Sequence, residues 1–377
     1  MQVRRSRLVL PLLVAGLASW AGSRAAAQSP EGAAPAGHFQ VQKLADGVYA
    51  AIRTETPGFA VDANVVFIIN DADVVVVDAN DTPASSREVL AALRKLTPKP
   101  VRYVVNTHWH DDHILGNQVY RDAFPGVEFV AHTATGEYLP TQGVAARNTM
   151  KENATNFGAM LREMLAKNRT GSGRELNDED RAAFRSDLEL VDRYIAEAPG
   201  VQIVLPTITI DQRLTLHRGR RTIDIRHLGR GHTAGDIVVH LPEEGILITG
   251  DLVVWPIPLV GSDQSHVSEW SATLGKLRAL HAKTIVPGHG PVMRDDSYLA
   301  LMEDLFASVT RQTRAAVTRS ETLEKAQASV QLEEFRKKFA GDSKLRSSVF
   351  ANYVAGPAVA AAYAEASPAP VPTKAAS

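Results

Sequence analysis

The chain of 377 residues contains no cysteine. This absence excludes disulfide bonds, thiolate metal ligands and a cysteine nucleophile. Stability must then come from a hydrophobic core, for which 45% of the residues are hydrophobic, and from any bound metal. The chain also has little net charge, −1 at pH 7, so nothing in its electrostatics favours a nucleic acid or an anionic membrane as a partner.

The N-terminus has the pattern of a bacterial secretory signal. Three arginines within the first seven residues precede an apolar run from residue 8 to about residue 22, and the alanines at 25–27 offer a cleavage site. The run contains Pro11 and is short for a membrane span, so we predict a removed signal peptide over 1–27, no stable membrane insertion, and a periplasmic or secreted protein. Its removal would take away four arginines and no acid, which leaves a charge of −5. Both Sec and twin-arginine export stay open.

The first half of the chain alternates strands with a helix. Residues 28–37 are rich in Ala, Pro and Gly and are expected to form a flexible leader. We expect strands at 41–52 with a hairpin at Asp46-Gly47, at 64–69, 74–77, 101–105 and 127–131, and a helix at 85–96. Strand, helix and strand in this order predict an α/β fold. Residues 54–60 are either a flap over a site or a long hairpin connection.

In the second half of the chain, strands and helices follow one another in an order similar to that of the first half. Apolar residues at helical spacing predict a helical insertion at 133–198. Further strands are expected at 201–205, 214–217, 222–227, 237–241, 245–248 and 284–286, with helices at 270–281 and 297–318. We therefore predict a main domain over 38–320, a C-terminal helical extension over 321–365 and a disordered tail over 366–377.

Metal-ligand residue types are concentrated at residues 107–113, directly after the strand at 101–105. His108, His110, Asp112 and His113 fall within six positions, a density that favours a metal site over ordinary polar loop residues. In an extended loop, side chains two residues apart point to the same side, so His108 and His110 can bind one ion. If a helix begins after His110, the side chains of Asp112 and His113 point to a different position, where a second ion could bind. Imidazole and carboxylate ligands suit zinc first, with iron or manganese as alternatives.

Three further strand ends carry ligand types beside glycine. They are Gly231-His232-Thr233, Thr249-Gly250-Asp251 and Pro287-Gly288-His289-Gly290. Glycine next to a ligand lets the backbone approach an ion without a clash.

Together these motifs, H-x-H-x-D-H, G-H-T, G-D and G-H-G, resemble those of the metallo-β-lactamase superfamily, in the family's order and over roughly residues 40–300. The resemblance implies a four-layered αβ/βα sandwich with two metals at the edges of its sheets. Here that sandwich would carry a helical insertion and C-terminal helices.

The resemblance also implies a role for each ligand. His108, His110 and His232 would hold the first metal, and Asp112, His113 and His289 the second. Asp251 would bridge the two metals together with a hydroxide. Asp78, at the end of the strand at 74–77, matches the aspartate that supports the ligand loop from outside the ligand set.

This arrangement implies a dinuclear zinc hydrolase, with two zinc ions per chain, acting on a small carbonyl compound: a β-lactam, lactone, ester or thioester. Two divalent ions outweigh two carboxylates and one hydroxide, so the centre stays positive and can activate water. Asp112 and Asp251 are the catalytic carboxylates that would orient the hydroxide. An aspartate at position 251, where true metallo-β-lactamases usually have Cys or Ser, weighs against strong β-lactamase activity.

Two other functions stay open. One is a mononuclear iron sulfur dioxygenase, and the other is a metal-binding accessory protein of a periplasmic redox or quinoprotein pathway. Oligomeric state is also open. The residues expected to contact a small-molecule substrate are Phe59, Trp109, Trp255, Asp263 and His266.

Overall fold

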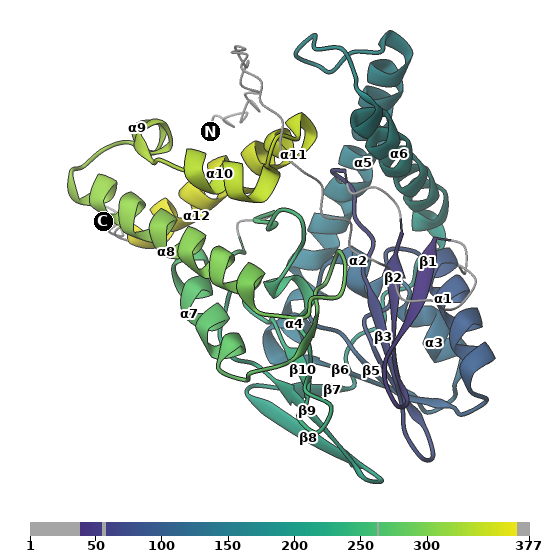
Figure 1. The fold of residues 1–377 in the computed structure, drawn as a ribbon. Coiled ribbons are helices and arrows are strands. Elements are labelled where there is room, and N and C mark those ends of the chain that lie inside the picture. The colour runs from purple at the N-terminus through teal and green to yellow at the C-terminus, as the bar shows by residue number, and fades with distance from the viewer. Residues whose placement is uncertain (1–37, 55–57, 262–263, 368–377) are drawn as a thin grey trace, which may run out of the picture.

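The computed structural model describes residues 38–54, 58–261 and 264–367 (Figure 1). Its larger sheet has seven strands that follow one another in sequence order. They are β1 (Phe39–Ala45), β2 (Val48–Arg53), β3 (Val65–Ile69), β4 (Val74–Val77), β5 (Val101–Val105), β6 (Glu128–His132) and β7 (Ile208–Ile210). Strands β1 to β4 are antiparallel neighbours, and β4 to β7 are parallel. The predicted hairpin at Asp46-Gly47 is confirmed.

The smaller sheet has five strands in the order β12-β11-β10-β9-β8. They are β8 (Arg213–Arg218), β9 (Arg221–Arg226), β10 (Val238–Leu241), β11 (Ile246–Ile248) and β12 (Thr284–Val286). Only the pair formed by β11 and β12 is parallel.

The two sheets pack face to face around a shared core. Strand β4 illustrates the reason, because its side chains alternate between two apolar environments. Val75 and Val77 lie in the core shared with Ile225 and Val239 of the smaller sheet, whereas Val74 and Val76 face the other way. A strand that is buried on both faces needs apolar residues at every position, and the four valines of β4 meet this requirement.

Helices cover the outer face of each sheet. Helices α1 (Pro83–Leu96) and α3 (Asn117–Ala123) pack on the larger sheet, and α7 (Val267–Arg278) and α8 (Ser297–Thr318) pack on the smaller one (Figure 1). The predicted four-layered αβ/βα sandwich is therefore confirmed.

The expected insertion contains α4 (Thr133–Tyr138), α5 (Gln142–Lys167) and α6 (Asp178–Glu197), of which α5 and α6 pack side by side (Figure 1). The strand expected at 201–205 is wrong. That segment has no regular structure after the short turn η1 (Ala198–Gly200), and β7 pairs with β6 instead. Pro206 lacks an N–H and so separates this segment from the ladder, which begins with the bond from the Thr207 N–H to the Phe129 carbonyl oxygen at 2.8 Å.

Beyond α8 the chain continues in short helices that join the core of the smaller sheet. They are α9 (Leu323–Ser329), α10 (Glu333–Ala340), α11 (Lys344–Phe350), the π-helix η3 (Ala351–Ala355) and α12 (Gly356–Ala366). Among the described residues, no helix has the length and apolarity that crossing a membrane requires. The predicted signal peptide and leader, and all but the first two residues of the predicted tail, lie outside the described residues. The division into domains stays a prediction.

Candidate metal centre

The ligand loop follows β5 and changes conformation in its middle. His110 is extended, with φ −64° and ψ 148°, and directly precedes the one-turn helix α2 (Asp111–Ile114). His108 and His110 therefore belong to the extended part, and Asp112 and His113 to the helical turn. This is the change of direction that the sequence predicts, and it sends the two pairs of ligand side chains to different points.

The remaining ligand candidates come from the smaller sheet. His232 lies between β9 and β10, Asp251 lies in η2 (Gly250–Leu252) directly after β11, and His289 follows β12. Gly288 is required at its position, because a Cβ there would lie 1.9 Å from Asp251 Oδ1. The missing side chain lets the two strand ends approach each other.

The first group of ligand atoms comprises His108, His110, His232 and Asp251, all within 4.8 Å of one another. His110 Nδ1 lies 3.0 Å from His108 Nε2 and 2.8 Å from His232 Nε2. Three imidazole nitrogens thus converge on one point.

The second group comprises Asp112, His113, His289 and Asp251, again within 4.8 Å. His289 Nε2 lies 3.0 Å from Asp112 Oδ2 and 3.4 Å from His113 Nε2. His113 Nε2 lies 3.4 Å from Asp112 Oδ2.

Asp251 belongs to both groups, and its two oxygens are divided between them. Oδ1 lies 3.1 Å from His113 Nε2 and 3.2 Å from His289 Nε2. Oδ2 lies 3.5 Å from His232 Nε2 and 4.0 Å from His108 Nε2.

The outward-facing ring nitrogens of the ligand histidines have hydrogen-bond partners that fix their tautomers. His232 Nδ1 lies 2.9 Å from the Leu259 carbonyl oxygen, and His289 Nδ1 lies 3.1 Å from that of Asp62. A carbonyl oxygen only accepts, so both Nδ1 atoms carry the proton. In the neutral ring, each Nε2 lone pair is then directed to the centre, as metal ligation requires.

Asp78 holds the ligand loop from behind. Its Oδ1 accepts a hydrogen bond from the Thr107 backbone N–H at 2.8 Å, and its Oδ2 lies 2.8 Å from His113 Nδ1. Asp78 is 1% exposed and has φ +64°, a backbone conformation that Asp tolerates better than most residues. It therefore lies where the sequence places it, against a ligand histidine.

The donor set fits divalent cations. When the imidazoles of His113 and His289 are neutral, as metal ligation requires, the buried oxygens Asp112 Oδ2 and Asp251 Oδ1 have no hydrogen-bond donor within the described part of the chain. A buried carboxylate oxygen without a partner is costly, and a cation at each group would satisfy it. Imidazole and carboxylate ligands without thiolate suit zinc, iron or manganese.

The charges of the two groups differ in the metal-free protein. Burial and the neighbouring His232 lower the pKa of His110 to about 3, and burial likewise lowers the pKa values of His108 and His232. In the second group burial also opposes protonation, but the carboxylates of Asp251 and Asp112 outweigh it and raise the pKa of His289 to about 10. Burial opposes protonation of His113 as well, but the carboxylates of Asp78, Asp112 and Asp251 raise its pKa well above the usual value.

The helical insertion packs directly on the ligand loop. The Trp109 ring lies 4.0 Å from that of Tyr138 and 4.1 Å from that of His110, measured between centroids, and is 9% exposed. The Tyr194 hydroxyl of α6 donates to Asp111 Oδ2 at 3.2 Å. Trp109 therefore anchors the insertion, and its expected contact with substrate stays a prediction.

Three of the other residues expected to contact substrate lie in described parts of the chain, and their neighbours differ. Phe59 packs on Phe157 of α5 and Tyr353 of η3. The Trp255 backbone N–H donates to the His289 carbonyl oxygen at 3.1 Å, and the His266 N–H to that of Gly231 at 2.7 Å. The fifth candidate, Asp263, lies outside the described residues. No substrate contact of these residues is tested, and all stay predictions.

The sequence interpretation missed residues that shape the loops. Asp236 Oδ1 accepts hydrogen bonds from the Thr233 backbone N–H at 3.0 Å and hydroxyl at 2.6 Å, and so closes the turn after His232. The spacing of Thr233 and Asp236 is a turn signal that could have revealed this. Ser265 donates to the His232 carbonyl oxygen at 2.9 Å, and neither it nor Tyr194 has a local sequence signal.

Comparison with known proteins places this centre in a family. The family model described as the metallo-beta-lactamase superfamily matches residues 58–289, more than half of the chain. A linear primary-alkylsulfatase from Pseudomonas sp. is 29% identical over 250 residues, 64% of this chain and 44% of that protein. A hydroxyacylglutathione hydrolase from Gloeobacter violaceus is 36% identical over 85 residues, 22% of this chain and 33% of that protein. The chain thus spans less than half the length of each of these two relatives.

Among solved structures, a metallo-beta-lactamase from Pontibacter korlensis matches with a TM-score of 0.49 and 21% identity, over 71% of this chain and 99% of that one. The family match covers all four segments that hold ligand candidates and ends at the last of them, His289. The chain belongs to the metallo-beta-lactamase superfamily, whose members are mostly hydrolases.

Proposed function

We propose that this protein is an exported, dinuclear zinc-dependent hydrolase of a small carbonyl compound: a β-lactam, lactone, ester or thioester. The observation that carries the proposal is the placement of Asp251, whose two oxygens face the two groups of ligand atoms separately. A carboxylate in this position can hold two ions close together, which is the arrangement that two-metal hydrolases use.

The residues take distinct roles. His108, His110 and His232 would hold the first ion, Asp112, His113 and His289 the second, and Asp251 both. Divalent ions, when bound, lower the pKa of water and polarise a carbonyl group. Asp112 and Asp251 are the carboxylates placed to orient a water molecule and to accept its proton. Asp78, through His113, keeps the ligand loop in position.

A second candidate substrate is a sulfate ester. The 250-residue similarity to a linear primary-alkylsulfatase favours it. So does Arg346 of α11, whose guanidinium lies 5.2 Å from the ring centroid of Trp255, next to the ligand residue His289. Arg346 also forms a 3.7 Å ion pair with Glu179 of α6. A cation over the ring of Trp255, one of the expected substrate contacts, suits a substrate with an anionic end, as alkyl sulfates have.

Metal analysis with a substrate panel tests the proposal. The protein is purified without added metal and offered a chromogenic β-lactam, a lactone, a simple ester, a thioester and a primary alkyl sulfate. About two zinc ions per chain with turnover of a carbonyl substrate support the main proposal, and turnover of the alkyl sulfate alone supports the second candidate. One iron per chain without hydrolysis would favour the oxygenase alternative. Stoichiometric metal without any turnover would favour an accessory role.

Export is tested separately. The three early arginines and the apolar run that follows support it. Fractionation of expressing bacteria and the intact mass of the product decide it, because cleavage after Ala27 removes residues 1–27. A full-length product in the cytoplasm would reject this part of the proposal.

A further inference from the structure

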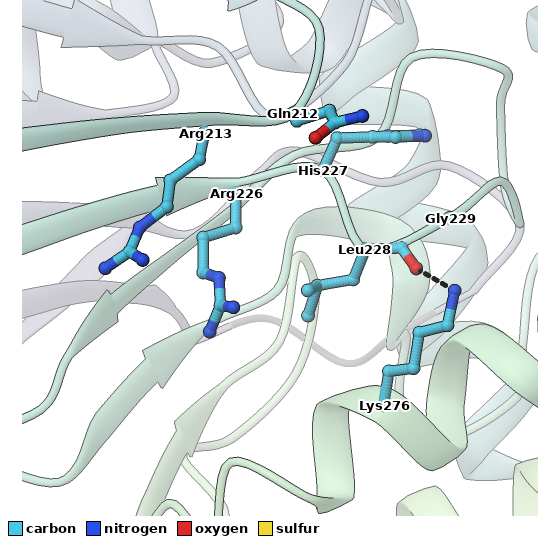
Figure 2. Close-up of a pocket in the computed structure, with 7 residues that line it drawn as sticks. All are labelled: Gln212, Arg213, Arg226, His227, Leu228, Gly229 and Lys276. Atoms are coloured by element: carbon cyan, nitrogen blue, oxygen red, sulfur yellow. Dashed lines mark hydrogen bonds between the residues drawn. The ribbon is translucent and has the colours of Figure 1, made fainter.

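A cavity of about 350 Å³ lies at one edge of the smaller sheet, and no metal-ligand candidate lines it (Figure 2). Its lining comes from β8 and the residue before it, from β9 and the segment after it, and from α7. The lining residues are Gln212, Arg213, Arg226, His227, Leu228, Gly229 and Lys276.

The two arginines of this cavity lie directly opposite each other. Arg213 of β8 and Arg226 of β9 are partners in the antiparallel register, and their side chains extend to the same side of the strand pair (Figure 2). Like charges at directly opposed positions destabilise a strand pair. Their placement therefore calls for a compensating negative charge.

The protein supplies only part of that charge. Asp224 Oδ1 accepts a hydrogen bond from Arg213 Nε at 2.6 Å, whereas Asp224 Oδ2 is 3.7 Å from Arg226 Nε. Among the described residues, Asp224 is the one acid that pairs with either arginine. The side chain of Arg226 is 29% exposed, so its guanidinium is partly removed from water while its charge is weakly matched.

A third cation completes the lining. Lys276 of α7 donates from Nζ to the Leu228 carbonyl oxygen at 2.7 Å, which holds the ammonium at the cavity wall (Figure 2). Three cationic side chains thus line the cavity, and one carboxylate, that of Asp224, pairs with two of them, so the cavity is net positive.

We propose that this cavity binds a phosphate group. Guanidinium groups bind phosphate oxygens through paired hydrogen bonds, and a lysine ammonium adds a compact charge. The volume lies at the lower end of the range for small-molecule sites, so the phosphate group arrives as the free ion or as part of a small phosphomonoester. The site is separate from the metal centre and does not depend on its function.

Calorimetric titration of the metal-loaded protein with inorganic phosphate, and separately with glycerol 3-phosphate, tests this site at constant ionic strength. We expect one saturable event that Arg226→Gln weakens by about tenfold or more. Lys276→Gln, a change at an exposed position, should weaken the same event. Arg220→Gln is the matched control, because Arg220 lies at the tip of the same strand pair, forms an exposed ion pair with Asp46 and does not line the cavity.

Thermal unfolding gives a second measurement. Saturating phosphate should raise the Tm of the wild type by about 2 °C. Arg226→Gln should lose this rise without lowering the Tm in phosphate-free buffer, because the substitution relieves repulsion with Arg213.

The outcomes are distinct. If phosphate binds only at the metal centre, both cavity substitutions leave its affinity unchanged, and this result overturns the proposal. Equal weakening by Arg220→Gln would show diffuse attraction and overturns it as well. Tighter binding of glycerol 3-phosphate than of phosphate identifies an ester ligand, and equal binding identifies the phosphate group alone.

Discussion

The hydroxyl of Tyr194 lies 3.2 Å from Asp111 Oδ2 and donates a hydrogen bond to it. Asp111 stands between two ligand candidates, His110 and Asp112, so this contact joins helix α6 to the centre of the ligand loop. On the same loop, Trp109 packs on Tyr138 of α4. The insertion therefore packs against the loop that carries the candidate metal ligands.

Tyr194→Phe should weaken metal binding as well as stability. The substitution leaves Asp111 without its hydroxyl donor, which costs about 1–2 kcal/mol in the free energy of unfolding, measured with urea. We expect metal affinity, measured by chelator competition, to fall several-fold. Tyr363→Phe is the control, because that hydroxyl donates to the Glu321 carbonyl oxygen, far from the loop in sequence. Equal metal affinity in the two variants would contradict the coupling.

Asp251→Ala should remove the second metal ion and reduce turnover by about a hundredfold or more, because Asp251 alone belongs to both ligand groups. The far-ultraviolet circular dichroism should stay close to that of the wild type. Metal content by mass spectrometry is the measurement, and Asp122→Ala, at an exposed position of α3, is the control. Two metal ions and an unchanged rate in the Asp251 variant would falsify the dinuclear assignment.

Asp78→Asn tests the support of the ligand loop. Asparagine keeps the size of the side chain and tolerates the positive φ, but its NH₂ group cannot accept a hydrogen bond from His113 Nδ1. We expect the affinity for the second metal to fall by about 10–100-fold while the fold persists. Competition with a chelator measures it, and an affinity equal to that of the wild type would show that Asp78 does not position His113.

The two groups should respond differently to pH. In the metal-free protein, His113 and His289 are protonated near neutral pH because carboxylates raise their pKa values, that of His289 to about 10. A metal ion must displace these protons, so affinity for the second group falls as pH falls, by up to about a hundredfold per unit if two protons leave.

His108, His110 and His232 are already neutral in that range, because their pKa values are lowered, that of His110 to about 3. Affinity for the first group should therefore change little with pH. Dialysis against buffered zinc from pH 9 to pH 5, with metal counted per chain, measures both responses. We expect one ion to leave before the other, and simultaneous loss would contradict the difference.

The layers of the fold were predictable because their signals are local. Val74–Val77 is a continuous apolar run bounded by turn residues, and Asp46-Gly47 is a strong hairpin signal, so both elements appear as expected. The apolar run at 201–205 also has the pattern of a strand, yet it is Ile208–Ile210 that pairs with β6. Only the position of β6 in space decides between the two segments, and local pattern does not contain it.

The ligand candidates were predictable for a different reason. His108 to His113 combine unusual density with a clear change from strand to helix, which fixes the directions of the side chains. The supporting contacts were not predictable, because they join distant segments. Tyr194 reaches Asp111 across 83 positions, and the His289 imidazole reaches the Asp62 carbonyl oxygen across 227. Such pairs carry no short-range signal.

The core of the smaller sheet unites residues made at very different times during synthesis. Leu161 and Phe184 of the insertion lie in the same apolar cluster as Phe350 and Val354 near the end of the described chain. Ser343 also donates to Glu179 Oε2 at 2.8 Å. On a ribosome, the insertion therefore emerges long before its packing partners and must wait for them with apolar surface exposed. The apolar face of the insertion is covered only after the C-terminal helices have been made, and a chaperone that shields the insertion during this interval would limit its aggregation.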